Sequence, residues 1–376
     1  MADGTDTLRG RLTEAVRTAG GWSTVHLDLS GDRENPEGLA ESRRRSVTER
    51  IAAAGADAST SDAVFEALST PTRLPSPFSR FLLARDGAVV VDEAIPGAAP
   101  GETLEVGALP HLAPLIRSGV DEFAYVVVQA SRDGGDVALH RTGAFFPEAV
   151  ATVTGRTDTL HKAQSGGWAM LNQHEHVEEI WKQTQSELSA EVDRLVRDER
   201  PRLVVVSGDV RARGLLLDAL GERARSLAVE LKKDTRAEGG DAGALDAFVG
   251  QQVAEVERRD RTDAIDLLRT RLPHERPTAA TGLHDVAEAL RQGQVDTLFV
   301  DVAALEDQAL LALGDVPWVA QQEGDAGPAP VVGEVPAVEA LVRAALLTDA
   351  RILTARSADL GASTAALLRW PIDRRP

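Results

Sequence analysis

Residues 123–141 read FAYVVVQASRDGGDVALHR, and this stretch decides the fold predicted for the middle of the chain. The run 123–131 is rich in β-branched and aromatic residues, which is typical of a strand. The four residues DGGD at 133–136 then indicate a turn into a second strand over 137–141. The sequence therefore predicts a β-hairpin here.

A long helix and a buried strand are predicted after this hairpin. Apolar residues recur at helical spacing over about 173–198, and Pro201 ends the predicted helix. The apolar face consists of Val177, Ile180, Trp181, Leu188, Val192 and Leu195. The segment 202–207, RLVVVS, is typical of a buried strand, and Asp209 suits the N-cap of a helix over 210–220. Elements in this order predict an α/β sandwich.

The segment before the hairpin, 1–119, predicts a smaller α/β domain. Helices are expected over 8–19 and 36–54, with a strand over 22–30 between them. A second hairpin is expected within 80–95, where an Asp-Gly pair separates two apolar runs.

The C-terminal segment predicts a third, alternating α/β/α domain. It follows a charged helix over 242–271 and a proline-containing linker over 272–281. Helices are expected over 283–291, 303–313 and 336–347, and strands over 295–300, 316–320 and 351–355.

Composition narrows the class of function. The chain has no cysteine, which excludes disulfides and thiolate metal sites, and its formal net charge is −18. Such acidity opposes non-specific nucleic-acid binding, so any RNA contact would need local basic patches. The sequence contains neither a long apolar run nor the features of a secretory signal, so a cytoplasmic protein that contacts no membrane is expected.

Patterns for metal, cofactor or catalytic chemistry are weak. His174 and His176 are two residues apart, so a helix would point them away from each other, and one ion would not be held by both. The turn 207–209, SGD, lacks the glycines and lysine of a phosphate-binding loop. The strand 125–131 carries no acid for Mg²⁺, which argues against a ribonuclease-H-type nuclease. No metal or cofactor is predicted, whereas a hydrolase triad assembled from distant residues stays open.

Two features indicate binding surfaces. Arg43, Arg44 and Arg45 are consecutive on the helix over 36–54, so at least one should be able to face a phosphate. Alternatively they form a solvated helix face, with Glu41 and Arg45 paired at i,i+4 spacing.

The second feature is a predicted loop over about 142–172, between the hairpin and the long helix. Its candidate tip consists of Gln164, Ser165, Gly166, Gly167 and Trp168. Adjacent glycines permit close approach of the backbone to a partner, and loops this long are functional or disordered. Alternatively the glycines only make a turn, with Trp168 packed beside a helix start that Asn172 and Glu175 cap.

The order of these parts resembles the bacterial relatives of the archaeal and eukaryotic class I release factor and Pelota. The resemblance implies an N-terminal domain over 1–119, a ribonuclease-H-like middle domain over 120–275 and an L7Ae-like domain over 280–376. Release factors carry Gly-Gly-Gln between the hairpin and the long helix, where this chain has Gly166-Gly167-Trp168. The residues Asn35-Pro36-Glu37 and Arg43-Arg44-Arg45 resemble the actinobacterial branch, which includes Balon-type hibernation factors.

The departure at Trp168 shapes the function that the resemblance implies. In release factors the glutamine positions a hydrolytic water at the peptidyl-transferase centre, whereas indole has one donor, no acceptor and a large apolar plane. The expected function is therefore a hibernation factor that occupies the A site of idle 70S ribosomes without hydrolysing peptidyl-tRNA. Arg43, Arg44 and Arg45 would contact rRNA or mRNA near the decoding region.

Two alternative functions stay open, and the resemblance implies a further partner. One alternative is a peptidyl-tRNA hydrolase that rescues stalled ribosomes, and another is an acidic interaction protein with no ribosomal role. Elongation factor Tu is an expected further partner at the C-terminal domain. Away from the ribosome, a monomer is expected.

Overall fold

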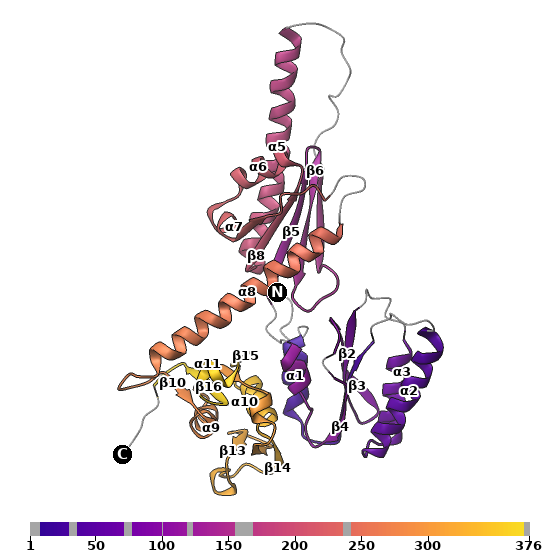
Figure 1. Cartoon of the computed structure of the whole chain (residues 1–376), viewed down its shortest axis with the longest axis vertical. Coiled ribbons are helices and arrows are strands. Elements are labelled where there is room, and N and C mark those ends of the chain that lie inside the picture. The colour runs from indigo at the N-terminus through magenta and orange to yellow at the C-terminus, as the bar shows by residue number, and fades with distance from the viewer. Residues whose placement is uncertain are drawn as a thin grey trace. The chain divides into compact units, whose positions relative to one another are not determined.

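The structure, a computed structural model, describes residues 8–29, 36–70, 77–99, 101–118, 123–154, 168–235 and 242–371. Within 36–40 and 168–180 and at residue 242, only the backbone is described. The chain divides into two compact units, one of Met1–Asp121 with Arg261–Pro376 and the other of Glu122–Asp260. Figure 1 labels most of the elements of each unit. The mixed α/β architecture predicted from the sequence is confirmed.

The second unit contains a five-stranded sheet in the order β7-β6-β5-β8-β9, of which Figure 1 labels β5, β6 and β8. Its strands are β5 (Ala124–Ser131), β6 (Gly134–Arg141), β7 (Ala149–Thr154), β8 (Leu203–Gly208) and β9 (Ala228–Glu230). Its helices are α5 (Trp168–Glu199), α6 (Val210–Ala219), α7 (Glu222–Leu227) and the first part of α8 (Ala242–Arg271). β5 pairs antiparallel with β6 and parallel with β8. The hairpin is confirmed, but β6 already begins at Gly134, so the turn lies earlier than the DGGD motif predicts.

Side chains of the central strands point alternately to the two faces of this sheet, and both faces are buried. Val126 and Val204 pack in one apolar cluster with residues of α5, including Leu188 and Val192. The intervening residues of the same strands, such as Val127, pack in a second cluster with α8. This is the period-two pattern of a sheet covered on both faces, and it confirms the predicted sandwich. The predicted apolar face of α5 is confirmed for Leu188, Val192 and Leu195, which are buried.

The N-terminal part of the first unit is a four-stranded sheet in the order β3-β2-β1-β4. Its strands are β1 (Trp22–Asp28), β2 (Phe78–Arg85), β3 (Ala88–Pro96) and β4 (Thr103–Gly107). Its helices are α1 (Leu8–Arg17), α2 (Pro36–Ala53), α3 (Ala58–Ser69) and α4 (Ala113–Ser118). The predicted hairpin turn is confirmed: Asp86 and Gly87 have φ values of 50° and 76°, as a two-residue turn requires.

The C-terminal part of the first unit has two sheets, in the orders β10-β16-β11-β15 and β13-β12-β14. The strands are β10 (Ala279–Thr281), β11 (Val295–Val300), β12 (Ala309–Leu313), β13 (Val319–Ala320), β14 (Val331–Pro336), β15 (Arg351–Thr354) and β16 (Thr364–Leu368). The helices are α9 (Leu283–Arg291), η1 (Ala303–Leu305), η2 (Glu323–Asp325), α10 (Ala337–Leu347) and α11 (Ser357–Leu360).

Two predictions for this region are wrong. The helix expected over 303–313 is a single 3₁₀ turn followed by strand β12, because pairing with β13 and β14 overrides a helix-favouring composition. The linker expected over 272–281 ends in strand β10, which pairs with β16.

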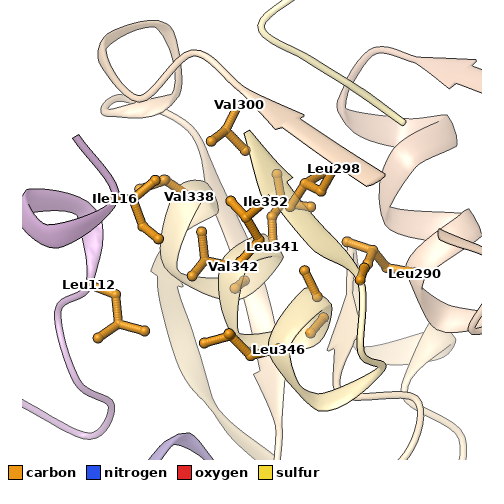
Figure 2. Packing of buried hydrophobic residues seen from close by; sticks show 14 of the residues in the cluster. Leu112, Ile116, Leu290, Leu298, Val300, Val338, Leu341, Val342, Leu346 and Ile352 are labelled. Atoms are coloured by element: carbon orange, nitrogen blue, oxygen red, sulfur yellow. The ribbon is translucent and has the colours of Figure 1, made fainter. Parts of the chain in front are cut away.

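The N-terminal and C-terminal parts of the first unit share one apolar core. Figure 2 shows Leu112 and Ile116, from the region of α4, directed toward Val338 and Val342 of α10. The three domain ranges implied by the resemblance remain a prediction, and within the structure the first and third of them contribute to the same compact unit.

Two buried charged residues of α10 reinforce this shared core. The carboxylate of Glu339 accepts hydrogen bonds from the backbone N–H groups of Leu112, at 2.7 Å, and Ala113, at 3.0 Å. The guanidinium of Arg343 donates to the carbonyl of Val16, at 2.8 Å, and to that of Leu313, at 2.6 Å. Both side chains thus satisfy backbone groups that the apolar core removes from water.

Candidate functional site

The loop predicted to carry the functional tip is shorter than the sequence suggests. β7 occupies Ala149–Thr154, and α5 already begins at Trp168. Of the candidate tip, Gln164, Ser165, Gly166 and Gly167 lie outside the described residues. The backbone of Trp168 is helical, and its side chain is not described.

The predicted capping of a helix start by Asn172 and Glu175 is wrong, whereas the glycine turn and the side chain of Trp168 lie outside what the structure describes. The capping prediction placed Asn172 at the N-cap and Glu175 three residues further on. Both residues lie inside α5, beyond its first residue, Trp168. The glycine pair therefore directly precedes the helix, with Trp168 as the first helical residue.

Helix α5 reaches beyond the sheet on which it packs. Figure 1 shows it continuing past the strand ends. Among the side chains described on α5, burial begins at Thr184, sixteen residues after Trp168. At 1.5 Å per residue, this length corresponds to about 24 Å of helix. The segment next to the glycines therefore belongs to a helix that continues past the sheet of its unit.

Trp181 of α5 is in contact with two arginines. The guanidinium carbon of Arg132, in the turn between β5 and β6, lies 5.4 Å from the centre of the indole ring. That of Arg211, in the first turn of α6, lies 5.6 Å from it. Arg132 is also paired with Asp209, at 3.1 Å. The sequence pattern places Trp181 on the apolar face of the helix. It does not reveal these contacts, because they join three elements that are distant in the sequence.

Asp209 occupies the N-terminus of α6, as the sequence predicts. Its carboxylate accepts hydrogen bonds from the N–H groups of Arg211, at 3.0 Å, and Ala212, at 3.1 Å. Burial alone would raise the pKa of Asp209, but these bonds and Arg132 outweigh it and lower the pKa. A carboxylate therefore already fills the place where a phosphate would bind, which agrees with the absence of a phosphate-loop motif.

The three consecutive arginines of α2 differ in their surroundings. Arg45 pairs with Glu41 at 3.2 Å, so the predicted i,i+4 pair is confirmed. Arg43 lies 3.5 Å from Glu102. Arg44 is half-buried, and its Nε atom has no hydrogen-bond partner among the residues that the structure describes. Their proposed contact with RNA stays a prediction.

A metal site finds no support in the described part of the chain. There, no three acidic or histidine side chains come together as ligands. His161 lies outside the described residues, and for His174 and His176 only the backbone is described. Likewise, no described helix combines the length and the apolar character that a membrane crossing requires.

Residues 124–274, which contain the hairpin, α5 and α8, match the model of bacterial archaeo-eukaryotic release factor family 2. The similarity to release factors shown by this match therefore lies in this segment. The matched residues begin with β5 and end just after α8, so the family domain includes the whole described sheet of the second unit.

Longer similarities extend outside this domain. The uncharacterized protein Rv2629 of Mycobacterium tuberculosis is 26% identical over 291 residues, which is 77% of each chain. Archaeal Pelota, from a model of its ribosome-bound form with ABCE1, shares 14% identity over 97% of this chain and 94% of that chain, with a TM-score of 0.43. Pelota of Archaeoglobus fulgidus shares 16% identity over 78% and 80%, with a TM-score of 0.37.

Proposed function

We propose that the release-factor-like protein binds 70S ribosomes and occupies the A site of idle particles without hydrolysing peptidyl-tRNA. The observation that carries this proposal is the residue after the glycine pair, within the family domain. Gly166 and Gly167 lead directly into α5, and Trp168 is its first residue. The long arm of α5 would carry this residue to the peptidyl-transferase centre.

The chemistry of Trp168 favours occupancy over catalysis. A water that attacks an ester needs a partner that accepts one of its protons or orients its lone pair. Indole offers a single N–H donor and no acceptor, but its face stacks well on a nucleobase. The specific observation in favour of a hydrolase is Gln164, an amide in the same segment. It precedes the glycines, so it would not share the backbone geometry of a glutamine after them.

A paired assay separates the two functions. Purified protein is mixed with 70S ribosomes that carry peptidyl-tRNA, and sedimentation and peptide release are measured together. The proposal expects co-sedimentation with release at the background rate. Release well above background would establish the hydrolase instead, and failure to co-sediment would contradict both functions. Elongation factor Tu, added with GTP, tests the expected GTPase partner in the same assay.

Trp168→Ala is expected to weaken ribosome binding about fivefold or more, because losing one stacked base contact costs about 1–3 kcal/mol. The melting temperature should be unchanged, since the backbone of α5 continues past the strand ends of its unit on this side. Affinity is measured by sedimentation and stability by thermal unfolding. A large fall in melting temperature would show instead that Trp168 belongs to a packed core.

Replacing Arg43, Arg44 and Arg45 with Gln is expected to weaken ribosome association and to flatten its salt dependence, because each phosphate contact contributes to that slope. Titrations at several salt concentrations measure both quantities. The matched control replaces Arg258, Arg259 and Arg261 of α8, which are exposed and carry the same charge. Equal effects of the two variants would remove the α2 arginines from the interface.

A further inference from the structure

The contacts of Trp181 with Arg132 and Arg211 define an Arg–Trp–Arg cluster on the second unit. Its members come from α5, from the β5–β6 turn and from the start of α6. All three meet at the end of the sheet where β5 and β8 finish, because Ala130 pairs with Gly208 at that end. The cluster thus joins three elements at one edge of the release-factor-like domain.

The cluster is fixed by one carboxylate. Asp209 accepts hydrogen bonds from the side chain of Arg132 and from the backbone N–H of Arg211. It therefore holds both arginine-bearing segments beside Trp181. The Arg132 side chain nevertheless remains 60% exposed, and neighbouring Val210 is 76% exposed. A contact that served packing alone would bury these groups. Here a charged side chain and apolar surface are exposed to solvent together.

Further charges lie at the same sheet end. Lys232 and Lys233 follow β9 and are exposed, and the carbonyl of Lys233 accepts the N–H of Gly208. Acidic residues are present as well, since Asp133 lies in the β5–β6 turn and Asp234 follows the lysines. Among the described residues, and with Arg213 and Glu230 counted, five basic residues therefore gather with four acidic ones on a chain whose net charge is −18. The net charge of this sheet end is therefore less acidic than that of the whole chain.

We propose that the Arg–Trp–Arg cluster is an RNA contact surface. Arg132 donates from Nε to Asp209 and has its Nη2 3.1 Å from the same carboxylate, and this pair together with stacking fixes the orientation of its remaining N–H donors. Phosphate oxygens that accept from such ordered donors cost less entropy on binding. Nucleobases stack on indole and guanidinium planes alike, whatever their sequence. The inference rests on the proposed function for its choice of ribosomal RNA as the strand.

The test uses the full chain with Arg132→Gln and Arg211→Gln combined. One probe is a fluorescent adenylate oligonucleotide of about 12 nucleotides, a length typical of single-strand sites. The other is the 70S ribosome. The matched control combines Arg194→Gln with Arg197→Gln, which removes two exposed charges from the C-terminal part of α5.

The cluster variant should bind both probes about tenfold or more weakly, and its salt slope should fall by about 1–2, whereas the control should change little. Trp181→Leu should weaken binding and Trp181→Phe should retain most of it, because a phenyl ring preserves a stacking face. If the Gln variant loses its fold by circular dichroism, Arg132→Lys with Arg211→Lys replaces it. That variant keeps the positive charges but loses the planar guanidinium groups, so it should also bind both probes more weakly.

Three outcomes would overturn the inference. They are binding unchanged by the cluster variant, equal losses in cluster and control variants, and weaker ribosome binding with unchanged oligonucleotide binding. The last would assign the cluster to an acidic protein surface instead. If the wild type binds the oligonucleotide through the cluster but does not sediment with ribosomes, the proposed function fails and the RNA surface stands.

Discussion

Gly208→Ala is expected to destabilise the release-factor-like unit strongly. Gly208 ends β8 with a φ of +114°, a conformation that residues with a side chain rarely adopt. A Cβ atom at this position would lie 1.8 Å from the carbonyl oxygen of Ala130, on the neighbouring strand. Relief of this overlap requires the two central strands to separate, so we expect a loss of about 4 kcal/mol or more. Whole domains are typically stable by only about 5–15 kcal/mol.

Hydrogen exchange resolves this effect by unit, because peptides from β5 and β8 report the second unit alone. The matched control is Gly214→Ala, inside α6, where an added Cβ meets no atom within 4 Å. Alanine favours a helix over glycine by up to about 1 kcal/mol, so the control should be neutral or stabilising. Wild-type protection in Gly208→Ala would contradict the strand geometry at this sheet end.

Glu339→Ala is expected to destabilise the first unit by about 2–4 kcal/mol. It would leave the buried N–H groups of Leu112 and Ala113 without their acceptor. A buried donor without a hydrogen-bond partner lowers the stability of the folded state. Urea unfolding combined with hydrogen exchange of α4 and α10 measures the change. The same substitution at exposed Glu334, on β14, is the control and should have little effect. Similar losses at the two positions would contradict the role given to Glu339.

The same carboxylate gives the first unit a pH dependence. Burial lowers the pKa of His111, but its hydrogen bond with Glu339, at 2.8 Å, and the charges of Glu339 and Glu105 outweigh burial, so the pKa is raised. Arg117 opposes this rise. Because the folded pKa lies above the unfolded one, the added stability is complete below about pH 6.5 and is lost as pH rises through the folded pKa. The slope should vanish in His111→Gln, and an equal slope in that variant would contradict the assignment.

The sequence predicts this fold best where a pattern is long and self-contained. Helix α8, helix α9 and strand β11 have the bounds expected from periodicity alone. Short strands were missed when their pairing is set by distant segments, as for β4, β7 and β16. The segment over 303–313 was misassigned because alanine and leucine suit a helix as well as a buried strand, and only the partners β13 and β14 decide between them.

In the candidate site, too, local features are predictable from the sequence, whereas contacts between distant segments are not. Asp209 as a cap and Glu41 with Arg45 as a pair follow from local spacing, and both were predictable. The contacts of Trp181 with Arg132 and Arg211 depend on how strand ends and helices meet, so no spacing in the sequence reveals them.

The most direct test of the proposed function is a cryo-electron microscopy map of the protein on idle 70S ribosomes that carry P-site tRNA. The account predicts density for the chain in the A site, with residues 164–168 in the peptidyl-transferase centre, the peptidyl-tRNA ester intact and no water coordinated by Trp168. Density for these residues outside that centre, or a deacylated P-site tRNA produced by the wild-type protein, would contradict it.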